Sequence, residues 1–248
     1  MTCFAVRHRM DNAILAIYYD LSEESRNKYL GWFHEKYLPE LLSRSGYLWV
    51  AHYEAASAGR RFQKVLDALG RTSDPGQSSG TGFVALFGGE STRTFFNPSL
   101  KQLKEREGDE AKEMIGLRVL ARAWIYTVEW SMDGPESRTR DSRGTPAPAI
   151  QMGRFNAPRE DEEDLGAWYA QERMPMVSRA PGCVGGRKLL AAAGDPKHAV
   201  LYEFISLEAR ENHFVPLEET AWSDRIHHYV VHPPGSPFVG RRIWPPAS

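Results

Sequence analysis

The sequence has few cysteines, no long apolar run and almost no net charge, and each shortage excludes a class of protein. Its 248 residues include two cysteines, Cys3 and Cys183, which are too few for a disulfide framework. No apolar run approaches the roughly 20 residues that span a bilayer. A formal net charge of -1 gives no general attraction to nucleic acid or anionic membrane. We therefore expect a globular protein that binds neither nucleic acid nor membrane.

Targeting and nucleotide-binding motifs are also missing. Residues 1–12 lack an apolar core and a small-residue cleavage site, so we expect a loose arm rather than a secretory signal. A reducing cytoplasm is then the expected compartment. The sequence contains no GxGxxG or Walker-type loop, and the turn-rich segment 76–82 lacks the lysine that a phosphate loop needs.

A segment of 15 letters occurs twice. Residues 32–46 read WFHEKYLPELLSRSG, and residues 168–182, which begin 136 positions later (168 − 32), read WYAQERMPMVSRAPG. Tryptophan, proline and glycine keep the same register in both copies, at Pro39 and Pro175 and at Gly46 and Gly182. These residue types are uncommon, so the match predicts an internal duplication.

Apolar periodicity divides the first copy into alternating strands and helices. The expected strands are residues 14–19, 47–55, 83–87 and 119–130. A helix should run from Ser22 through Tyr37, and helical pieces should fill 91–117. Residues 57–82 form an insertion with a short helix at 60–69 and a Gly- and Ser-rich loop from 72 to 82. We expect residues 71–82 to be a mobile loop that acts as a lid over the cleft of the first half.

The second copy repeats this order after a linker at 131–148, which is rich in Gly, Pro, Ser and Arg. Its expected strands are 149–155, 184–191, 198–205 and 239–244. Its expected helices are 160–177 and 207–229, with a break near Pro216. The sequence thus predicts an α+β protein of two tandem ferredoxin-like βαββαβ units, 1–130 and 149–248.

The duplicated segment and the strand HYE that follows its first copy resemble the dimeric α+β barrel superfamily, and within it the EthD-like branch. The resemblance implies that the two antiparallel sheets pack into one barrel within a single chain. It implies enzymes without a bound cofactor, such as oxygenases, isomerases and decarboxylating lyases, although chlorite dismutases share the barrel and hold haem. Many relatives carry histidine two residues before the proline; here those positions are Tyr37 and Arg173.

The first half offers the groups for acid–base catalysis. His34 and Tyr37 lie on the first expected helix, and strand alternation places His52 and Glu54 on one face of the second strand. Glu54 could orient His52 as a general base, with Tyr37 as acid or hydrogen-bond donor. The alternative is that these side chains point to solvent or pair structurally.

The second half offers cations and aromatic rings for substrate binding. Arg173, Arg187 and Tyr202 stand near the corresponding positions, with Lys188 and Glu203 beside them, and an arginine there could clamp a carboxylate. A surface salt bridge is the alternative. Trp32 and Trp168 are expected to line the clefts. Arg122 and Trp124 repeat as Arg242 and Trp244, and we expect these four at the interface between the sheets.

We expect no metal and no haem. Four histidines, His213, His227, His228 and His232, stand close in sequence, but Pro233 and Pro234 interrupt helical spacing and no haem-attachment motif occurs.

These patterns favour a cytoplasmic, cofactor-independent enzyme of aromatic compound catabolism, with its site in the first half. It would act on a small hydrophobic, aromatic, carboxylate-bearing molecule by proton transfer, in a decarboxylase or lyase reaction. Two alternatives stay open: an oxygenase of a phenolic substrate, and a non-enzymatic binding or assembly module. Assembly into a homodimer is also left open.

Overall fold

The computed structural model describes residues 11–57, 59–141 and 144–247. Residues 1–10 of the predicted arm, including Cys3, lie outside the described residues. Asp11 and Asn12, at the end of that arm, are held in place. Trp49 Nε1 donates to Asp11 Oδ2 at 3.1 Å, and Asn12 Nδ2 donates to the Glu90 carbonyl at 3.1 Å. The predicted loose arm is therefore wrong for these two residues.

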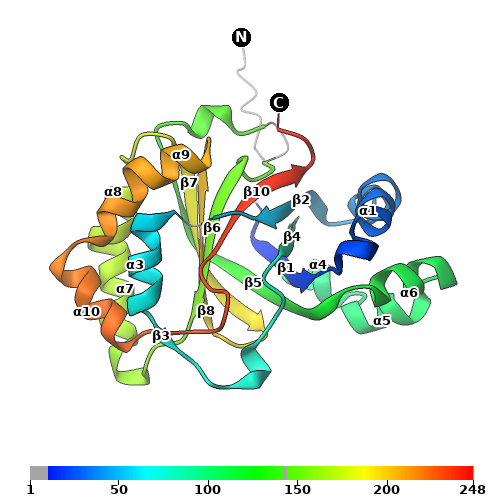
Figure 1. The fold of residues 1–248 in the computed structure, drawn as a ribbon, viewed down its shortest axis with the longest axis horizontal. Coiled ribbons are helices and arrows are strands. Elements are labelled where there is room, and N and C mark those ends of the chain that lie inside the picture. The colour runs from blue at the N-terminus through cyan, green and yellow to red at the C-terminus, as the bar shows by residue number, and fades with distance from the viewer. Residues whose placement is uncertain (1–10, 58, 142–143, 248) are drawn as a thin grey trace, which may run out of the picture.

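Eight strands close into a barrel in the order β1-β4-β2-β10-β6-β8-β7-β5, with antiparallel neighbours throughout (Figure 1). The first half supplies β1 (Ala13–Asp20), β2 (Tyr47–Ala55), β4 (Phe83–Gly89) and β5 (Val119–Asp133). The second half supplies β6 (Ala149–Phe155), β7 (Cys183–Ala193), β8 (His198–Phe204) and β10 (Phe238–Trp244). The predicted α+β fold of two tandem ferredoxin-like units in one barrel is confirmed.

Strands β5 and β10 join the two sheets. β5 pairs with β1 of its own half and with β7 of the other, and β10 pairs with β6 and with β2. These strands carry the repeated Arg-x-Trp motif, and Trp244 lies opposite His52 across the junction. The interface position is confirmed for Arg242 and Trp244, and for Trp124, which donates to the Asp195 carbonyl of the other half at 3.0 Å, but not for Arg122, which pairs with Tyr18 of its own half. β5 also continues to Asp133, three residues into the segment predicted as linker, while the division into domains at 131–148 stays a prediction.

Alternation along each strand separates three apolar cores. On β1, Ile14 and Tyr18 point into the barrel, whereas Leu15 and Tyr19 point outward beneath helices. The barrel interior forms one core, and each half forms another between the outer face of its sheet and its helices. Figure 1 shows the helices gathered on opposite sides of the barrel. Each half can therefore hold a cleft of its own.

The duplicated segment folds the same way in both halves. In the first, α1 (Glu23–Trp32) starts at Ser22, which accepts from Ser25 N, and passes through a π-helical turn (Phe33–Tyr37) into α2 (Leu38–Leu42). Pro39 lacks the N–H of a regular helix, and the widened turn lets the helix continue past it. The second copy repeats the π-helical turn at Tyr169–Arg173.

The glycine that closes each copy has a positive φ, +85° at Gly46 and +79° at Gly182. This backbone conformation strains other residues, and it turns the chain from helix into strand. The remaining first-half helices are α4 (Arg93–Phe96), α5 (Leu100–Arg106) and α6 (Asp109–Gly116). The second half has α7 (Glu162–Trp168), α8 (Met174–Val177), α9 (Leu207–Ala209) and α10 (Ala221–Tyr229). The predicted break near Pro216 is a 3₁₀ turn, Val215–Glu218.

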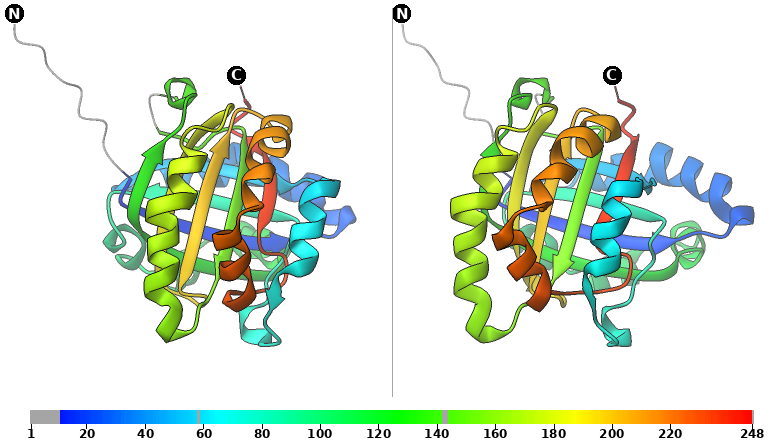
Figure 2. Two further views of the ribbon diagram at one scale, coloured as in Figure 1. Left: turned by 90° about the vertical axis from the view of Figure 1, so that its left-hand side faces the viewer. Right: turned by 60° about the vertical axis from the view of Figure 1, so that its left-hand side comes forward.

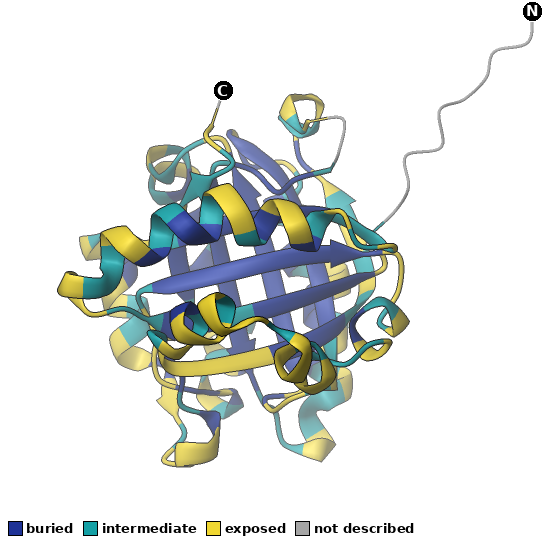
Figure 3. Cartoon of the chain, turned by 90° about the vertical axis from the view of Figure 1, so that its right-hand side faces the viewer, coloured by how far each residue is buried: buried dark blue, intermediate teal, exposed yellow. Residues whose placement is uncertain are grey.

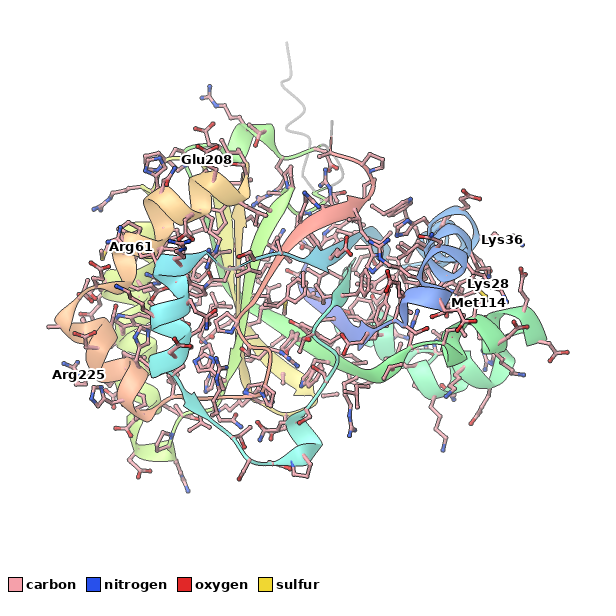
Figure 4. All side chains as sticks on the ribbon, in the orientation of Figure 1. Lys28, Lys36, Arg61, Met114, Glu208 and Arg225 are labelled. Atoms are coloured by element: carbon pink, nitrogen blue, oxygen red, sulfur yellow. The ribbon has the colours of Figure 1, made fainter. Side chains whose placement is uncertain are left out.

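The insertion of the first half covers the second half. Its helix α3 (Arg60–Ala68) buries Phe62 in the second-half core, and β3 (Gly70–Arg71) pairs in parallel with β9 (Val231–His232). Figure 2 shows α3, in cyan, in the same layer as the second-half helices. In Figure 4 Arg61 accordingly lies on the side of Arg225, away from Lys28.

The prediction of a lid over the first-half cleft is therefore wrong. The apolar stripe of α3 finds its partner in the second half, about 100 residues or more along the chain. The loop that follows is tied back to the barrel, because the N–H groups of Thr81 and Gly82 donate to Asp20 Oδ1 at 2.8 and 2.6 Å. Within the described residues, none of the helices is long and apolar enough to cross a membrane.

Candidate functional site

The two halves leave very different amounts of space between sheet and helices. The first-half cleft lies between the outer face of β1, β4 and β5 and the helices α2, α5 and α6, and holds about 180 Å³. The second-half cleft lies beneath α3, α7 and α10, and holds about 50 Å³. Figure 3 shows the first-half face, with buried strands between two layers of helix. Of these two clefts, the first-half cleft has the more room for an organic ligand.

Apolar side chains form most of the first-half cleft, and its charged side chains are all cationic. The apolar part includes Leu15, Ile17, Leu41, Phe87, Leu100 and Ile115. Its charged lining residues are Lys104, Arg118 and Arg122, and Tyr37 and Tyr47 complete the wall. An apolar space bordered by cations suits a small apolar anion.

Arg118 is the central polar group of this cleft. Its Nε donates to Tyr29 Oη at 2.6 Å, and its Cζ lies 5.0 Å from the centre of the Tyr19 ring. The Nη2 nitrogen is buried and has no hydrogen-bond partner among the described residues. Nε–H and Nη2–H point from the same edge of a guanidinium, so an anion at Nη2 would sit beside the Tyr29 hydroxyl.

A hydrogen-bonded chain runs behind Arg118 toward solvent. Tyr19 Oη lies 2.7 Å from His52 Nε2, and His52 Nδ1 lies 2.8 Å from His34 Nε2. Tyr19 and His52 are fully buried, whereas His34 is half-buried. Either tautomer of His52 keeps both bonds, because the ring accepts at one nitrogen and donates at the other. We call Tyr19, His52 and His34 the relay.

Burial keeps the relay neutral. It lowers the pKa of His34 to about 4. The pKa of His52 lies well below its ordinary value, first because of burial and then because of His34 and Arg118. Burial also raises the pKa of Tyr19 well above that of an ordinary phenol. At neutral pH the relay therefore contains two neutral imidazoles and a phenol, the forms that can pass a proton along a chain.

Four of the residues selected from sequence differ from expectation in their position or their contacts. Glu54 pairs with Arg26 at 2.6 Å, so Glu54 does not orient His52. Tyr37 lines the cleft, but its hydroxyl donates to Glu107 at 2.9 Å. Trp32 packs on Tyr37, with ring centres 4.8 Å apart, and is part of the core rather than the cleft lining. His52 is likewise behind the cleft wall.

Side chains occupy the second-half cleft. Arg173, the counterpart of Tyr37, pairs with Glu218, donates to the Leu217 carbonyl at 3.1 Å and donates to Tyr202 Oη at 3.4 Å. Trp168 packs 5.8 Å from this guanidinium. In this packing the donors of Arg173 are engaged by the protein itself.

Arg187 and Lys188 point to opposite faces of β7. Arg187 enters the barrel, where it donates to Glu203 and packs against Trp49, so it cannot join Arg173 in one cleft as expected. Lys188 stands at the position equivalent to His52. Its Nζ contacts His198 Nδ1 at 3.1 Å and Glu129 Oε2 at 3.3 Å, and burial lowers the pKa of this amine.

The described residues contain no group of three or more His, Cys, Asp or Glu side chains that could hold a metal ion. His227 and His232 border the second-half cleft, but a porphyrin does not fit its 50 Å³, since ordinary ligand pockets measure about 300–1,000 Å³. His232 is buried with its Nδ1 3.3 Å from Ser236 Oγ, and burial lowers its pKa to about 3. Cys183 is buried and free.

Sequence reasoning missed Arg118, Tyr19 and Tyr29. Tyr19 shares the outer face of β1 with Leu15 and Ile17, so alternation could have placed it opposite His52. Arg118 precedes the start of β5 and belongs to none of the motifs, and Tyr29 lies within the predicted first helix, where no motif marks it. Only the fold brings these three side chains to one point.

Solved structures share this fold at low sequence identity. A candidate chlorite dismutase, TA0507, matches with a TM-score of 0.56 and 15% identity over 94% of this chain and 96% of its own. An anthrone oxidase-like protein matches with a TM-score of 0.56 and 11% identity over 95% and 92%. Chlorite dismutase from Candidatus Nitrospira defluvii, in complex with imidazole, matches with a TM-score of 0.55 and 12% identity over 94% and 91%.

No protein-family model matches the chain, and no curated protein sequence matches it. At these identities the likeness establishes the fold, that of the dimeric α+β barrels, within one chain. It leaves the choice of site and chemistry to the geometry of the clefts.

Proposed function

We propose that the chain is an enzyme that binds a small aromatic acid in the first-half cleft and catalyses proton transfer on it, with decarboxylation as the specific reaction. One observation carries this proposal. Arg118 lines an apolar cleft beside a neutral relay, and its buried Nη2 has no hydrogen-bond partner among the described residues. Burying a cationic donor without a partner is costly, so such a group favours an anionic ligand.

The size and charge of the cleft support a single aromatic ring. Its 180 Å³ is close to that of an engineered cavity of about 150 Å³ that binds benzene. The cations Lys104, Arg118 and Arg122 favour an anion. A hydroxybenzoate-type acid fits both requirements, with its ring oxygen against Arg118 and Tyr29.

The relay supplies the proton that decarboxylation needs. The proton would add to the ring carbon that bears the carboxylate, with electrons supplied through the ring by the phenolate oxygen; the carbon–carbon bond then breaks, its electron pair restores the aromatic ring, and CO2 leaves. Arg118 would stabilise the phenolate oxygen that drives this protonation. The Tyr29 ring packs on Tyr19, with centres 5.6 Å apart, and the relay would bring the replacement proton from solvent through His34.

A second candidate is an oxygenase that acts on a phenol without a cofactor. The three cations would favour the phenolate, which is the electron-rich form that reacts with O2. We also propose that the chain belongs to the EthD-like branch, whose resemblance suggested both reactions. A cytoplasmic location and assembly into a homodimer are proposed with it.

A substrate screen separates the candidates. Purified protein is incubated with hydroxybenzoates and with the corresponding phenols, while CO2 release and O2 uptake are recorded in parallel. CO2 release without O2 uptake supports the decarboxylase, and O2 uptake supports the oxygenase. Saturable binding without turnover supports a binding module. If none of these acids or phenols binds, the proposed function is wrong.

A further inference from the structure

The two ends of the barrel interior differ in charge balance. At one end Arg187 donates to Glu203 and lies 3.2 Å from Asp11, while Arg140 lies 3.2 Å from the same Glu203. Two cations there meet two carboxylates. This is the usual way in which a protein keeps charge in a buried place.

The other end holds a single buried cation, Arg154 of β6. Its side chain is 1% exposed, and its Cζ lies 3.9 Å from the centre of the Tyr18 ring and 4.4 Å from that of Trp124. Its Nη2 donates to Ser79 Oγ at 3.1 Å. Among the described residues it forms no ion pair with a carboxylate.

Two acidic residues of the neighbouring segments accept hydrogen bonds from neutral amides instead. Asp195 accepts from Gln77 Nε2 at 2.6 Å and from Asn156 Nδ2 at 2.8 Å. Asp20 accepts from two backbone N–H groups of the loop at 81–82. Arg154 therefore has no direct carboxylate partner among the described residues.

Four donor atoms are left without partners in the same region. Arg154 Nε and Nη1 and the hydroxyls of Tyr18 and Tyr126 are all buried, and none has a hydrogen-bond partner among the described residues. Tyr18 and Tyr126 both belong to the core inside the barrel, and Arg154 packs on the Tyr18 ring. Burial raises the pKa of Tyr18 to about 12 and holds the pKa of Tyr126 well above that of an ordinary phenol, so both stay protonated donors.

Stacking on aromatic rings does not satisfy these donors. Cation–π contacts use the faces of the guanidinium, whereas its N–H bonds lie in its plane. A water molecule would accept hydrogen bonds but would leave the charge unbalanced. An anion would both accept these hydrogen bonds and balance the charge of Arg154.

We propose that a small monovalent anion, of the size of chloride, binds inside the barrel against Arg154, Tyr18 and Tyr126. Trp124, on which Arg154 packs, also borders a space of about 290 Å³ next to Gln77 and Asp195, so that space lies close to the proposed site. The site lies inside the barrel, on the opposite face of the sheet from the first-half cleft, and is independent of the proposed function.

Bromide serves as the probe. Thermal unfolding of the full chain is followed from zero to 200 mM sodium bromide, with ionic strength held constant by sodium gluconate, whose anion is too bulky for the site. Wild-type protein should show a saturable rise in Tm, of about 4 °C at a twentyfold excess over Kd. Arg154→Met should show no saturable rise, and Arg159→Met, a charge-matched change at an exposed arginine, should behave as wild type.

Crystals soaked in bromide provide the direct test. An anomalous peak within hydrogen-bond distance of Arg154 supports the site. If Arg154→Met does not fold, the pair Tyr18→Phe and Tyr126→Phe replaces it, with an expected weakening of bromide affinity of at least tenfold. The proposal is overturned if wild type, Arg154→Met (or the double phenylalanine variant) and Arg159→Met respond alike to bromide, or if the soaked crystals show no peak beside Arg154.

Discussion

The two halves share one backbone plan but differ in what fills the space between sheet and helices. The second half receives α3 from the insertion, and its central arginine, Arg173, pairs with Glu218. Among the described residues no comparable insertion covers the first half, and its central arginine, Arg118, lines the cleft and has a buried nitrogen without a partner among those residues. Side chains thus fill most of one cleft, whereas the other keeps more space.

The two halves also differ at the position of His52 in the relay. His52 in the first half and Lys188 in the second occupy equivalent places on β2 and β7, 136 positions apart (188 − 52). His52 connects a buried phenol to a half-buried imidazole, whereas Lys188 is held between His198 and Glu129. We therefore expect only one of the two halves to use titratable groups for catalysis. The following experiments test which half that is.

The largest effect is expected at His52. His52→Ala breaks the relay, and the turnover number should fall by about 10²–10⁴-fold, the usual contribution of acid–base catalysis. Lys188→Ala is the matched control in the other half and should leave the turnover number of folded protein within about twofold. Steady-state kinetics on the acid found by screening give both values. Equal losses in the two variants would contradict a relay confined to the first half.

The next effect concerns stability in the second half. Arg173→Met leaves the Glu218 carboxylate buried without its partner, and the free energy of unfolding should fall by about 3–5 kcal/mol. Urea unfolding measures this change. The double variant Arg173→Met, Glu218→Leu should recover most of the loss, because an apolar pair needs no charge compensation. Ligand binding in the first half should be unchanged in both. A loss of binding without a loss of stability would move the site to the second half.

A smaller effect is expected at Tyr37, the counterpart of Arg173. Burial and Glu107 raise the pKa of this phenol, and its hydroxyl already donates to Glu107. We therefore expect Tyr37→Phe to reduce stability by about 1.5 kcal/mol, the scale of a hydrogen bond to a charged group. The turnover number should stay within about threefold. A fall of a hundredfold or more would instead make Tyr37 the catalytic acid that the sequence suggested.

A further effect is a matched pH response of one histidine in each half. Burial lowers the pKa of both His34 and His198 to about 4, whereas an unfolded histidine titrates near pH 6.5. Between these values the unfolded chain binds more protons, so stability is complete above about pH 6.5 and falls as the pH drops toward 4.

His34→Gln and His198→Gln should each make the stability less dependent on pH within that window. Urea unfolding at a series of pH values measures the slope, and exposed His228→Gln is the control. If either variant keeps the wild-type slope, the lowered pKa assigned to that histidine is wrong.

The sequence predicted the parts of the fold that depend on local pattern. The repeated Trp, Pro and Gly register located both ferredoxin-like units, and alternation placed His52 beneath the helix that carries His34. The docking of α3 could not be read in the same way. Its apolar stripe, around Phe62, would suit either half, and the choice depends on contacts with residues such as Glu219 that are distant in sequence.

The sequence likewise predicted only part of the candidate site, because some of its contacts join residues that are distant along the chain. His34, His52 and Tyr37 were selected from the chemistry of their side chains and the faces on which they lie. Arg118 was missed because nothing in its neighbours distinguishes it from the other arginines of the chain. Arg187 was misplaced because one position along a strand changes the face, and its carboxylate partners Glu203 and Asp11 come from different strands and segments.

The most direct test of the account is the affinity of the first-half cleft for an aromatic acid with and without Arg118. Calorimetry with 4-hydroxybenzoate on the wild type, Arg118→Gln and Arg106→Gln provides the comparison, since Arg106 is an exposed arginine at the end of α5. We predict that Arg118→Gln weakens binding at least tenfold, or about 1.4 kcal/mol, and that Arg106→Gln leaves it unchanged. Equal affinity in all three proteins would contradict the assignment of the site to the first half.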